Sequence, residues 1–274
     1  MSNRPGLRDH RLRIMEGVLV WEGEIGNARV RELFDLQVVQ ASRLLGDFRR
    51  KMAGQIVEDT RSKTLKPTSH NRLEPGVSLV DYAQLTHLHE ASNPRVIDAR
   101  CDLTAVSPEI FSVIRKAATK GLGVSIQYAS MAHPVFESRT VYPHSIVLVG
   151  RRWHVRAWCE KRQQFRDFNL GRISTADALP TLAPMPQSAD LDWQKMIEVR
   201  LSAHRALSPE QQIVVQRECL NGARETNIVV RSCLAAYVIQ DIRAAMSVAD
   251  ERPPQFQLEV LNAADIRSLL FSGG

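Results

Sequence analysis

The sequence predicts a multidomain α+β protein, and three observations carry that prediction. Apolar residues recur at helical spacing up to about residue 52, whereas they alternate at period two between residues 124 and 170. A proline-rich stretch, residues 180–186, then leads into a last segment where strand-like and helix-like patterns follow one another. At 274 residues, the chain is long enough for two or three small domains.

The N-terminal part predicts three helices, at residues 8–21, 30–34 and 37–52. A tight turn at Asp35 and Leu36 separates the second helix from the third. On a helical wheel, the third helix gathers its apolar residues on one side and directs Arg43 and Arg50 to the other. Helix, short helix, tight turn and helix is the order of a helix-turn-helix unit, whose last helix reads DNA.

Two strand-like segments around a basic turn follow the third helix. Gln55–Asp59 and Thr64–Pro67 flank the turn at residues 60–63, as the strands of a wing would. We therefore expect residues 1–70 to form a winged helix-turn-helix domain that binds double-stranded operator DNA. The alternative is a basic three-helix domain that binds another protein. The expected DNA contacts are Val39, Gln40, Ser42, Arg43, Arg50, Lys51, Arg61 and Lys63.

Residues 71–106 are poorly patterned, and their charge balance turns acidic. We expect a linker that carries short helices and a first strand near Arg95–Ala99. His87 and His89 form a His-X-His pair, but no third ligand stands at a fixed spacing from them. The sequence therefore predicts no metal site and no cofactor.

Residues 107–180 predict one helix and five short strands. Ser107 caps a helix that runs to Lys120, and Gly121 ends it. The expected strands are residues 124–129, 137–142, 145–149, 153–159 and 165–170, with a turn at Pro143 and His144. One helix and about five strands in this length suit a small Sm-like or SH3-like β-barrel.

The last two of these strands form a hairpin that carries three arginines, Arg156, Arg166 and Arg172, beside aromatic residues. Residues 115–172 hold 11 Lys and Arg against 3 Asp and Glu, far from the helix that should read DNA. This surplus favours a second surface that binds an anion. The alternative is a half-solvated sheet whose arginines pair with Asp167 and Glu160.

The hairpin also carries a family resemblance. The segments WHVRAWCE and FRDFNLGRI, with RTVYPHSIV just before them, resemble the core of a WYL domain, with Trp153, His154 and Val155 at the triplet that names the family. The resemblance implies a barrel that senses a nucleotide or single-stranded nucleic acid within a transcription regulator, of the kind encoded beside bacterial anti-phage defence systems. The ligand residues that it implies are Tyr128, Ser130, Arg139, His144, Trp153, Arg166, Asn169 and Arg172. His144 and His154 have a second interpretation, as histidines of the core.

After the proline-rich stretch, residues 187–274 predict a βαβα unit. The strands are expected around residues 193–203 and 227–230, and the helices after Ser208 and over residues 233–246. This α/β unit resembles the C-terminal extension of WYL regulators, which implies that it forms the homodimer.

These patterns together predict a homodimeric, cytoplasmic transcription regulator, a repressor of a phage-defence or related operon. Its DNA affinity would change when the WYL domain binds its effector. No apolar run reaches the length of a membrane span, and the four cysteines are too far apart for a zinc site. The alternatives are an accessory subunit that binds nucleic acid and, less favoured, a phosphodiesterase or nuclease built on His144, His154 and Arg166. No enzyme motif accompanies those three residues.

Overall fold

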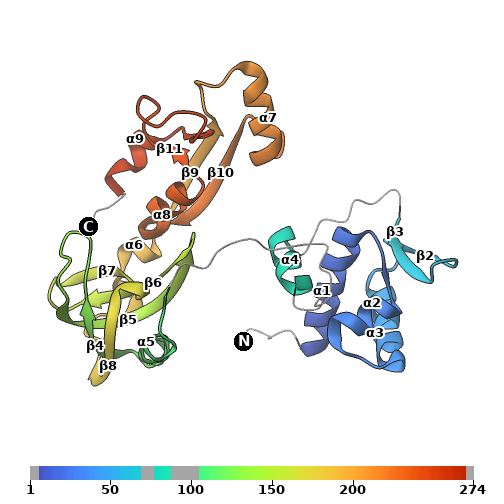
Figure 1. The fold of residues 1–274 in the computed structure, drawn as a ribbon, viewed down its shortest axis with the longest axis horizontal. Coiled ribbons are helices and arrows are strands. Elements are labelled where there is room, and N and C mark those ends of the chain that lie inside the picture. Colours follow the sequence, from blue (N-terminus) through green and yellow to red (C-terminus); the bar gives the residue numbers. More distant parts are fainter. Residues whose placement is uncertain (1–5, 69–76, 88–104, 270–274) are drawn as a thin grey trace. The chain divides into compact units, whose positions relative to one another are not determined.

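The computed structural model describes residues 6–68, 77–87 and 105–269, and the chain divides into two compact units, residues 1–101 and 102–274 (Figure 1). Each unit is described by itself. The strand expected at Arg95–Ala99 and the side chains of His87 and His89 lie outside the described residues.

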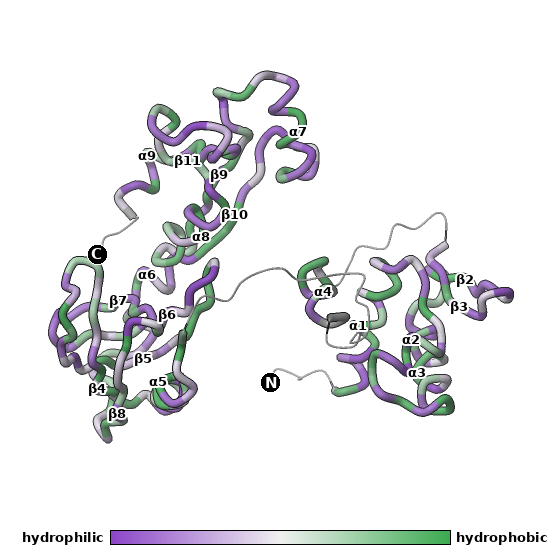
Figure 2. Tube along the Cα trace, in the orientation of Figure 1, coloured by the Kyte–Doolittle hydropathy of each residue, from purple (hydrophilic) through white to green (hydrophobic). Residues whose placement is uncertain are grey.

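The first unit contains the helices and the wing that the sequence predicts. Its elements are α1 (Leu7–Glu22), β1 (Ile25–Gly26), α2 (Asn27–Phe34), α3 (Val38–Lys51), β2 (Ile56–Asp59), β3 (Thr64–Pro67) and α4 (Leu79–His87). Asp35 ends α2 with φ near 49°, a left-handed conformation that Asp tolerates better than most residues. This turn leads directly into α3. The strands β2 and β3 pair antiparallel, and the turn between them is hydrophilic (Figure 2).

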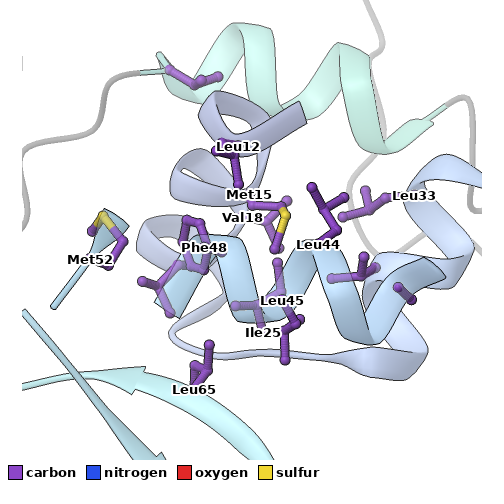
Figure 3. Packing of buried hydrophobic residues seen from close by; sticks show 14 of the residues in the cluster. Leu12, Met15, Val18, Ile25, Leu33, Leu44, Leu45, Phe48, Met52 and Leu65 are labelled. Atoms are coloured by element: carbon purple, nitrogen blue, oxygen red, sulfur yellow. The ribbon is translucent and has the colours of Figure 1, made fainter. Parts of the chain in front are cut away.

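The core of this unit lies where α1, α2 and α3 meet the small sheet (Figure 3). Phe48 of α3 and Met15 of α1 are fully buried there, together with Ile25 and Leu65 from the strands. Helix α4 packs against α1, and the indole of Trp21 donates a hydrogen bond of 2.9 Å to the carbonyl of Val77 just before α4. The apolar side of α3 is therefore buried in the core, and its opposite side faces solvent.

The second unit begins with a helix and a five-stranded antiparallel sheet. These elements are α5 (Pro108–Lys120), β4 (Leu122–Tyr128), β5 (Glu137–Val149), β6 (Arg152–Cys159), β7 (Gln164–Asn169) and β8 (Ile173–Leu182). Ser107 caps α5 as predicted, since its hydroxyl accepts from the backbone N–H groups of Glu109 and Ile110. The strand order is β7-β6-β5-β4-β8, and α5 packs on one face of the sheet.

Three details of this sheet differ from the sequence prediction. Within the described residues β7 and β8 are its two edges and do not pair, so the sheet is not a closed barrel. The predicted turn at Pro143 and His144 is wrong, because β5 runs through it with His144 as a bulge between paired Pro143 and Ser145. Strand β8 was not predicted, since most of its residues are exposed and it contains Pro180, which an edge strand tolerates.

The rest of the second unit is built on a four-stranded sheet of order β10-β9-β12-β11. Its elements are α6 (Leu191–Gln194), β9 (Met196–Ala203), α7 (Pro209–Cys219), β10 (Glu225–Arg231), α8 (Ala235–Asp241), β11 (Ala244–Ala245), β12 (Leu258–Val260) and α9 (Ala263–Ile266), with short 3-10 turns at 170–172, 187–189, 232–234 and 267–269. Strand, helix, strand and helix occur in the predicted order. The single helix predicted for residues 233–246 is wrong, because Arg243 adopts φ near 50° after α8 and the chain turns into β11.

The β5–β6 turn lies against the end of α8. Gly150 has φ near 55° there, and a Cβ at this position would lie 2.7 Å from a carboxylate oxygen of Asp241, at the end of α8. The turn therefore favours glycine for its backbone conformation, and any other residue would also require the side chain of Asp241 to move.

Candidate functional site

The outward side of α3 and the wing form an exposed polar surface. All eight residues expected to contact DNA are exposed in the structure. On α3 they are Val39, Gln40, Ser42, Arg43, Arg50 and Lys51, and in the wing they are Arg61 and Lys63. The structure thus directs the side chains of Arg43 and Arg50 to solvent, as the helical wheel predicts.

Some of these eight residues also bind neighbours within the domain. Gln40 accepts from the backbone N–H of Gln37 and completes a capping box, and Ser42 accepts a hydrogen bond of 2.8 Å from Asn27. Lys51 pairs with Glu16 at 2.7 Å, and Arg50 pairs with Asp47. In contrast, Arg43, Arg61 and Lys63 have no ion pair among the described residues, so their charges face solvent.

On the five-stranded sheet, a second group of expected residues lies together at the end of β4. Tyr128 is buried edge-to-face against Phe168, and its hydroxyl accepts from the backbone N–H of Asn169 at 3.4 Å. The guanidinium of Arg139 stands 5.7 Å from the Tyr128 ring centroid. The backbone N–H of Ala129 donates to the carbonyl of Arg172, which brings Arg172 to the same end of the sheet.

Arg139 is the least compensated charge of this group. Arg139 is 7% exposed, and its Nε has no hydrogen-bond partner among the described residues. The nearest carboxylate, that of Glu137, lies 3.7 Å away and is held more closely by Lys161, at 2.7 Å. A buried guanidinium is costly unless an anion meets it, so this position suits a negatively charged ligand.

Three of the expected ligand residues lie apart from the group at Tyr128. His144 projects from the β5 bulge, where its ring nitrogens contact Ser145 at 2.9 Å and Asp190 at 3.1 Å. Trp153 packs edge-to-face against Phe111 of α5. Arg166 lies opposite Ala157 on the edge strand β7. Ser130 follows β4 directly and holds its own turn, since its hydroxyl accepts from the N–H of His133.

His154, for which the sequence left two interpretations, is a buried residue of the sheet. Its ring stacks at a tilt on Tyr237, with centroids 4.7 Å apart, and neither ring nitrogen has a hydrogen-bond partner among the described residues. Burial, reinforced by the charges of Arg152 and Arg172, lowers the pKa of His154 to about 4. The imidazole is therefore neutral at physiological pH, and no described contact joins it to His144.

The hairpin arginine Arg156 has a structural partner that the sequence did not reveal. It donates hydrogen bonds of 2.7 and 2.9 Å to Asp190, which lies 34 residues further along the chain. Burial alone opposes ionisation of Asp190, but the hydrogen bonds from Arg156 and His144 outweigh it and hold the pKa of Asp190 well below its usual range. Arg156 therefore pairs with carboxylates of the protein itself. Its main partner is Asp190, and a longer contact of 3.4 Å joins it to Asp167.

Within the described ranges, His, Cys, Asp and Glu side chains do not gather in groups of three that would hold a metal ion. We also find no helix in those ranges with the length and apolar content that a membrane span requires.

Models of three known domain families match the chain, one after another. Residues 8–75 match the winged helix-turn-helix domain of the BrxR transcriptional regulator. Residues 109–178 match the WYL domain, and residues 196–266 match the C-terminal dimerization domain of the BrxR regulator.

Curated relatives match over nearly the whole chain. A DNA-binding transcriptional repressor CapW of Pseudomonas aeruginosa is 27% identical over 98% of this chain and 95% of its own length. CapW of Escherichia coli strain KTE188 is 28% identical with the same coverage, and CapW of Stenotrophomonas maltophilia is 25% identical over 95% of this chain and 91% of its own.

Among solved structures, the proteasome accessory factor B/C of Arthrobacter aurescens aligns with 14% identity and a TM-score of 0.30. The alignment covers 96% of this chain, which spans about half (48%) of that one, and the likeness is too low to argue from. The matched domains follow one another as a winged helix-turn-helix domain, a WYL domain and a dimerization domain, and this order supports a WYL-domain transcription regulator.

Proposed function

We propose that the protein is a homodimeric, DNA-binding transcriptional repressor whose affinity for its operator is controlled by an anionic ligand at the WYL domain. The observation that carries this proposal is the sequence of three domains, each matched to a regulator family, in a chain that aligns end to end with curated repressors. The repressed genes would be a phage-defence or related operon, as the sequence resemblance suggests.

The DNA-binding surface in this proposal is the exposed side of α3 with the wing. Arg43 has no competing ion pair among the described residues, and its long fork can reach a guanine edge in the major groove. Val39, 62% exposed near the start of α3, is suited to contact a thymine methyl group. Arg61 and Lys63, at the wing tip, are suited to phosphates.

The homodimer in this proposal forms through the C-terminal domain. Helix α7 exposes Ile213 (63%) and Val214 (62%), and the edge strand β10 exposes Val229 (63%). Single exposed apolar residues are ordinary, but here they lie on two consecutive elements of a domain that matches a dimerization family. Within the described chain β10 pairs on one side only, with β9, so its other side offers backbone hydrogen bonds to a partner.

The ligand in this proposal is a nucleotide or a short single-stranded nucleic acid. Arg139 supplies a buried positive charge that lacks a close carboxylate, and Tyr128 and Arg172 lie at the same end of the sheet. Guanidinium groups bind phosphate, and aromatic rings stack on bases, so this combination favours a nucleotide over inorganic phosphate. The expected set also includes Ser130 and Asn169 near that group, and His144, Trp153 and Arg166 apart from it.

The coupling between ligand and DNA requires a ligand that binds one of two protein states better than the other. His154 of the five-stranded sheet and Tyr237 of the C-terminal domain are in ring contact, and His154 pairs with the expected ligand residue Asn169 on the neighbouring strand. A ligand that reorients Arg172 or Asn169 would act on this contact first.

Fluorescence anisotropy with the DNA upstream of the gene tests the proposal. A repressor should bind this DNA with nanomolar affinity and lose affinity as salt rises, and it should discriminate against a scrambled duplex of the same length. Equal affinity for both duplexes would reject a sequence-specific repressor and favour a general nucleic-acid-binding subunit. The neighbouring genes test the operon assignment separately.

A further inference from the structure

A cavity of about 360 Å³ lies where the β6–β7 hairpin meets the C-terminal domain. We call it the seam cavity; it lies between residues 156–167 of the hairpin, residues 185–192 of the connecting segment and residues 232–237 at the start of α8. Its volume falls within the range of sites for small organic molecules. It is distinct from the group at Tyr128 and Arg139, whose residues do not line it.

Two polar side chains of the seam cavity lack adequate partners. Ser232 is 2% exposed, and its hydroxyl has no hydrogen-bond partner among the described residues. From the residues that the structure describes, Asp167 accepts only long hydrogen bonds, of 3.4 Å from Arg156 and 3.4 Å from Tyr237. Buried polar atoms in folded proteins are nearly always hydrogen-bonded, so a donor is missing from this place.

The charge of the cavity indicates the sign of the missing group. Three carboxylates line it, those of Asp167, Asp190 and Asp192, and Arg156 is bound closely by Asp190 alone. The guanidinium of Arg156 lies 3.9 Å from the carboxylate of Asp192. Arg166 also lines the cavity, so two guanidinium groups stand against the three carboxylates. Burial raises the pKa of Asp167, and the charge of Arg156 offsets this only in part. The carboxylates thus exceed the positive charge available to them.

The walls of the cavity are aromatic. Trp158 and Phe165 pack edge-to-face, with ring centroids 5.1 Å apart, and Tyr237 faces them from α8. Aromatic rings attract a desolvated cation through their negative faces, and they also pack against a flat apolar body.

We infer that the seam cavity binds a small organic cation with N–H donors, of the amidine or primary amine class, held by Asp167 and Ser232 between the aromatic walls. This site goes beyond the proposed function, because it takes a ligand of opposite charge from the nucleotide at the sheet end. Its occupancy would fasten the WYL sheet to the dimerization domain, since each of these two domains contributes one of the two groups that hold the ligand.

Isothermal titration of the full-length protein with benzamidine tests the inference, with benzoate as a probe of the same shape and opposite charge. Benzamidine should bind with a dissociation constant on the order of 1 mM, as expected for so small a ligand, and benzoate at least about tenfold more weakly. Asp167→Asn should weaken benzamidine binding by about tenfold or more, because it removes a charge-assisted pair. Asp177→Asn, on the exposed part of β8, is the matched control and should bind as the wild type does.

Ser232→Ala keeps the inference testable if Asp167→Asn does not fold. It removes a hydroxyl that has no partner, so the protein should fold at least as well as the wild type, while benzamidine affinity drops severalfold. Benzoate affinity equal to that of benzamidine, or unchanged benzamidine affinity in Ser232→Ala, would overturn the inference. Neither readout uses DNA, so the outcome is independent of the repressor proposal.

Discussion

Arg156 and Asp190 form a buried, two-pronged ion pair that joins the five-stranded sheet to the segment leading into the C-terminal domain. Its two hydrogen bonds measure 2.7 and 2.9 Å, and the side chains are 6% and 2% exposed. An ion pair so far from solvent contributes little net stability when complete, but the loss of one partner leaves an uncompensated buried charge.

We therefore predict that Arg156→Met destabilises the protein by about 3–5 kcal/mol, because Asp190 is left buried without its main partner. Urea denaturation measures the effect. The double substitution Arg156→Met with Asp190→Asn should recover a large part of the loss, since it removes both charges. Arg152→Met, on an exposed neighbour in β6, serves as the control. A loss in Arg156→Met no larger than in that control would refute a structural role for the pair.

Arg43→Ala should weaken operator binding by about 1–3 kcal/mol if this side chain reads a base, with no change in folding, because it is exposed on α3. Lys63→Ala should act through a phosphate instead, and should reduce the slope of log affinity against log salt by about one. Anisotropy titrations across a range of salt concentrations separate the two effects. Arg200→Ala, in the four-stranded sheet, is the control; a triple variant of Arg43, Arg50 and Lys63 that binds like wild type would exclude this surface.

Arg139→Met should leave the fold intact or more stable, because the buried guanidinium lacks a close anion in the free protein. The same variant should no longer respond to the nucleotide or oligonucleotide that releases the wild type from its operator. Thermal melts and anisotropy with effector present measure the two properties. Lys161→Met removes a nearby exposed charge and should keep the response. If Arg139→Met melts many degrees lower than wild type, its arginine is structural and the ligand assignment fails there.

His154 should make the protein less stable in mild acid. Its folded-state pKa, about 4, lies below the ordinary value of 6.5, so only the unfolded chain takes up a proton as the pH falls through that interval. The stability contribution is complete above pH 6.5 and is lost between there and pH 4, by about 2 kcal/mol at about pH 5. His154→Phe should abolish this part of the pH dependence and be near neutral at about pH 7.5, since neither ring nitrogen has a partner to lose.

Denaturation curves at these two pH values measure the effect of His154. His133→Ala changes an exposed histidine and should preserve the acid sensitivity of the wild type. An equal acid sensitivity in His154→Phe and in wild type would mean that other groups control it.

Ile213→Asp with Val214→Asp should dissociate the dimer, because each buried aliphatic side chain contributes roughly 1.5–3 kcal/mol to an interface. The association constant should fall at least about a hundredfold. Light scattering at micromolar concentration measures it, with Leu182→Asp, which changes an exposed residue of β8, as the control. Truncation after residue 185 should also yield a monomer, but it removes Asp190 and so exposes the Arg156 defect as well. The double substitution separates these two causes, and a stable dimer of that variant would exclude the α7 face.

Features that depend on nearby residues could be predicted from the sequence. The caps at Ser107 and Ser208, the outward side of α3 and the wing strands all follow from spacings of a few residues, and the structure has each of them. The resemblance in the hairpin also led to Tyr128 and Arg139, which the structure places in contact.

Features that depend on distant contacts could not be predicted. Asp190 stands just before the first strand expected in the last segment, and nothing local marks it as the partner of a strand residue 34 positions earlier. Tyr237 looked like one apolar residue of a helix, although its ring covers His154. The bulge at His144 has the same origin, because a proline next to a polar residue resembles a turn until the facing strand is known.

Because Gly150 lies close to α8, an insertion in the β5–β6 turn would disturb the packing of that helix. Surface turns usually accept extra residues, but here even a Cβ would lie 2.7 Å from the carboxylate of Asp241 and would require that side chain to move. A short peptide inserted at Gly150 would act as a wedge between the WYL sheet and α8. Protein engineers could use that wedge to force the protein into one signalling state, without altering a residue of the ligand site or of the DNA-binding surface.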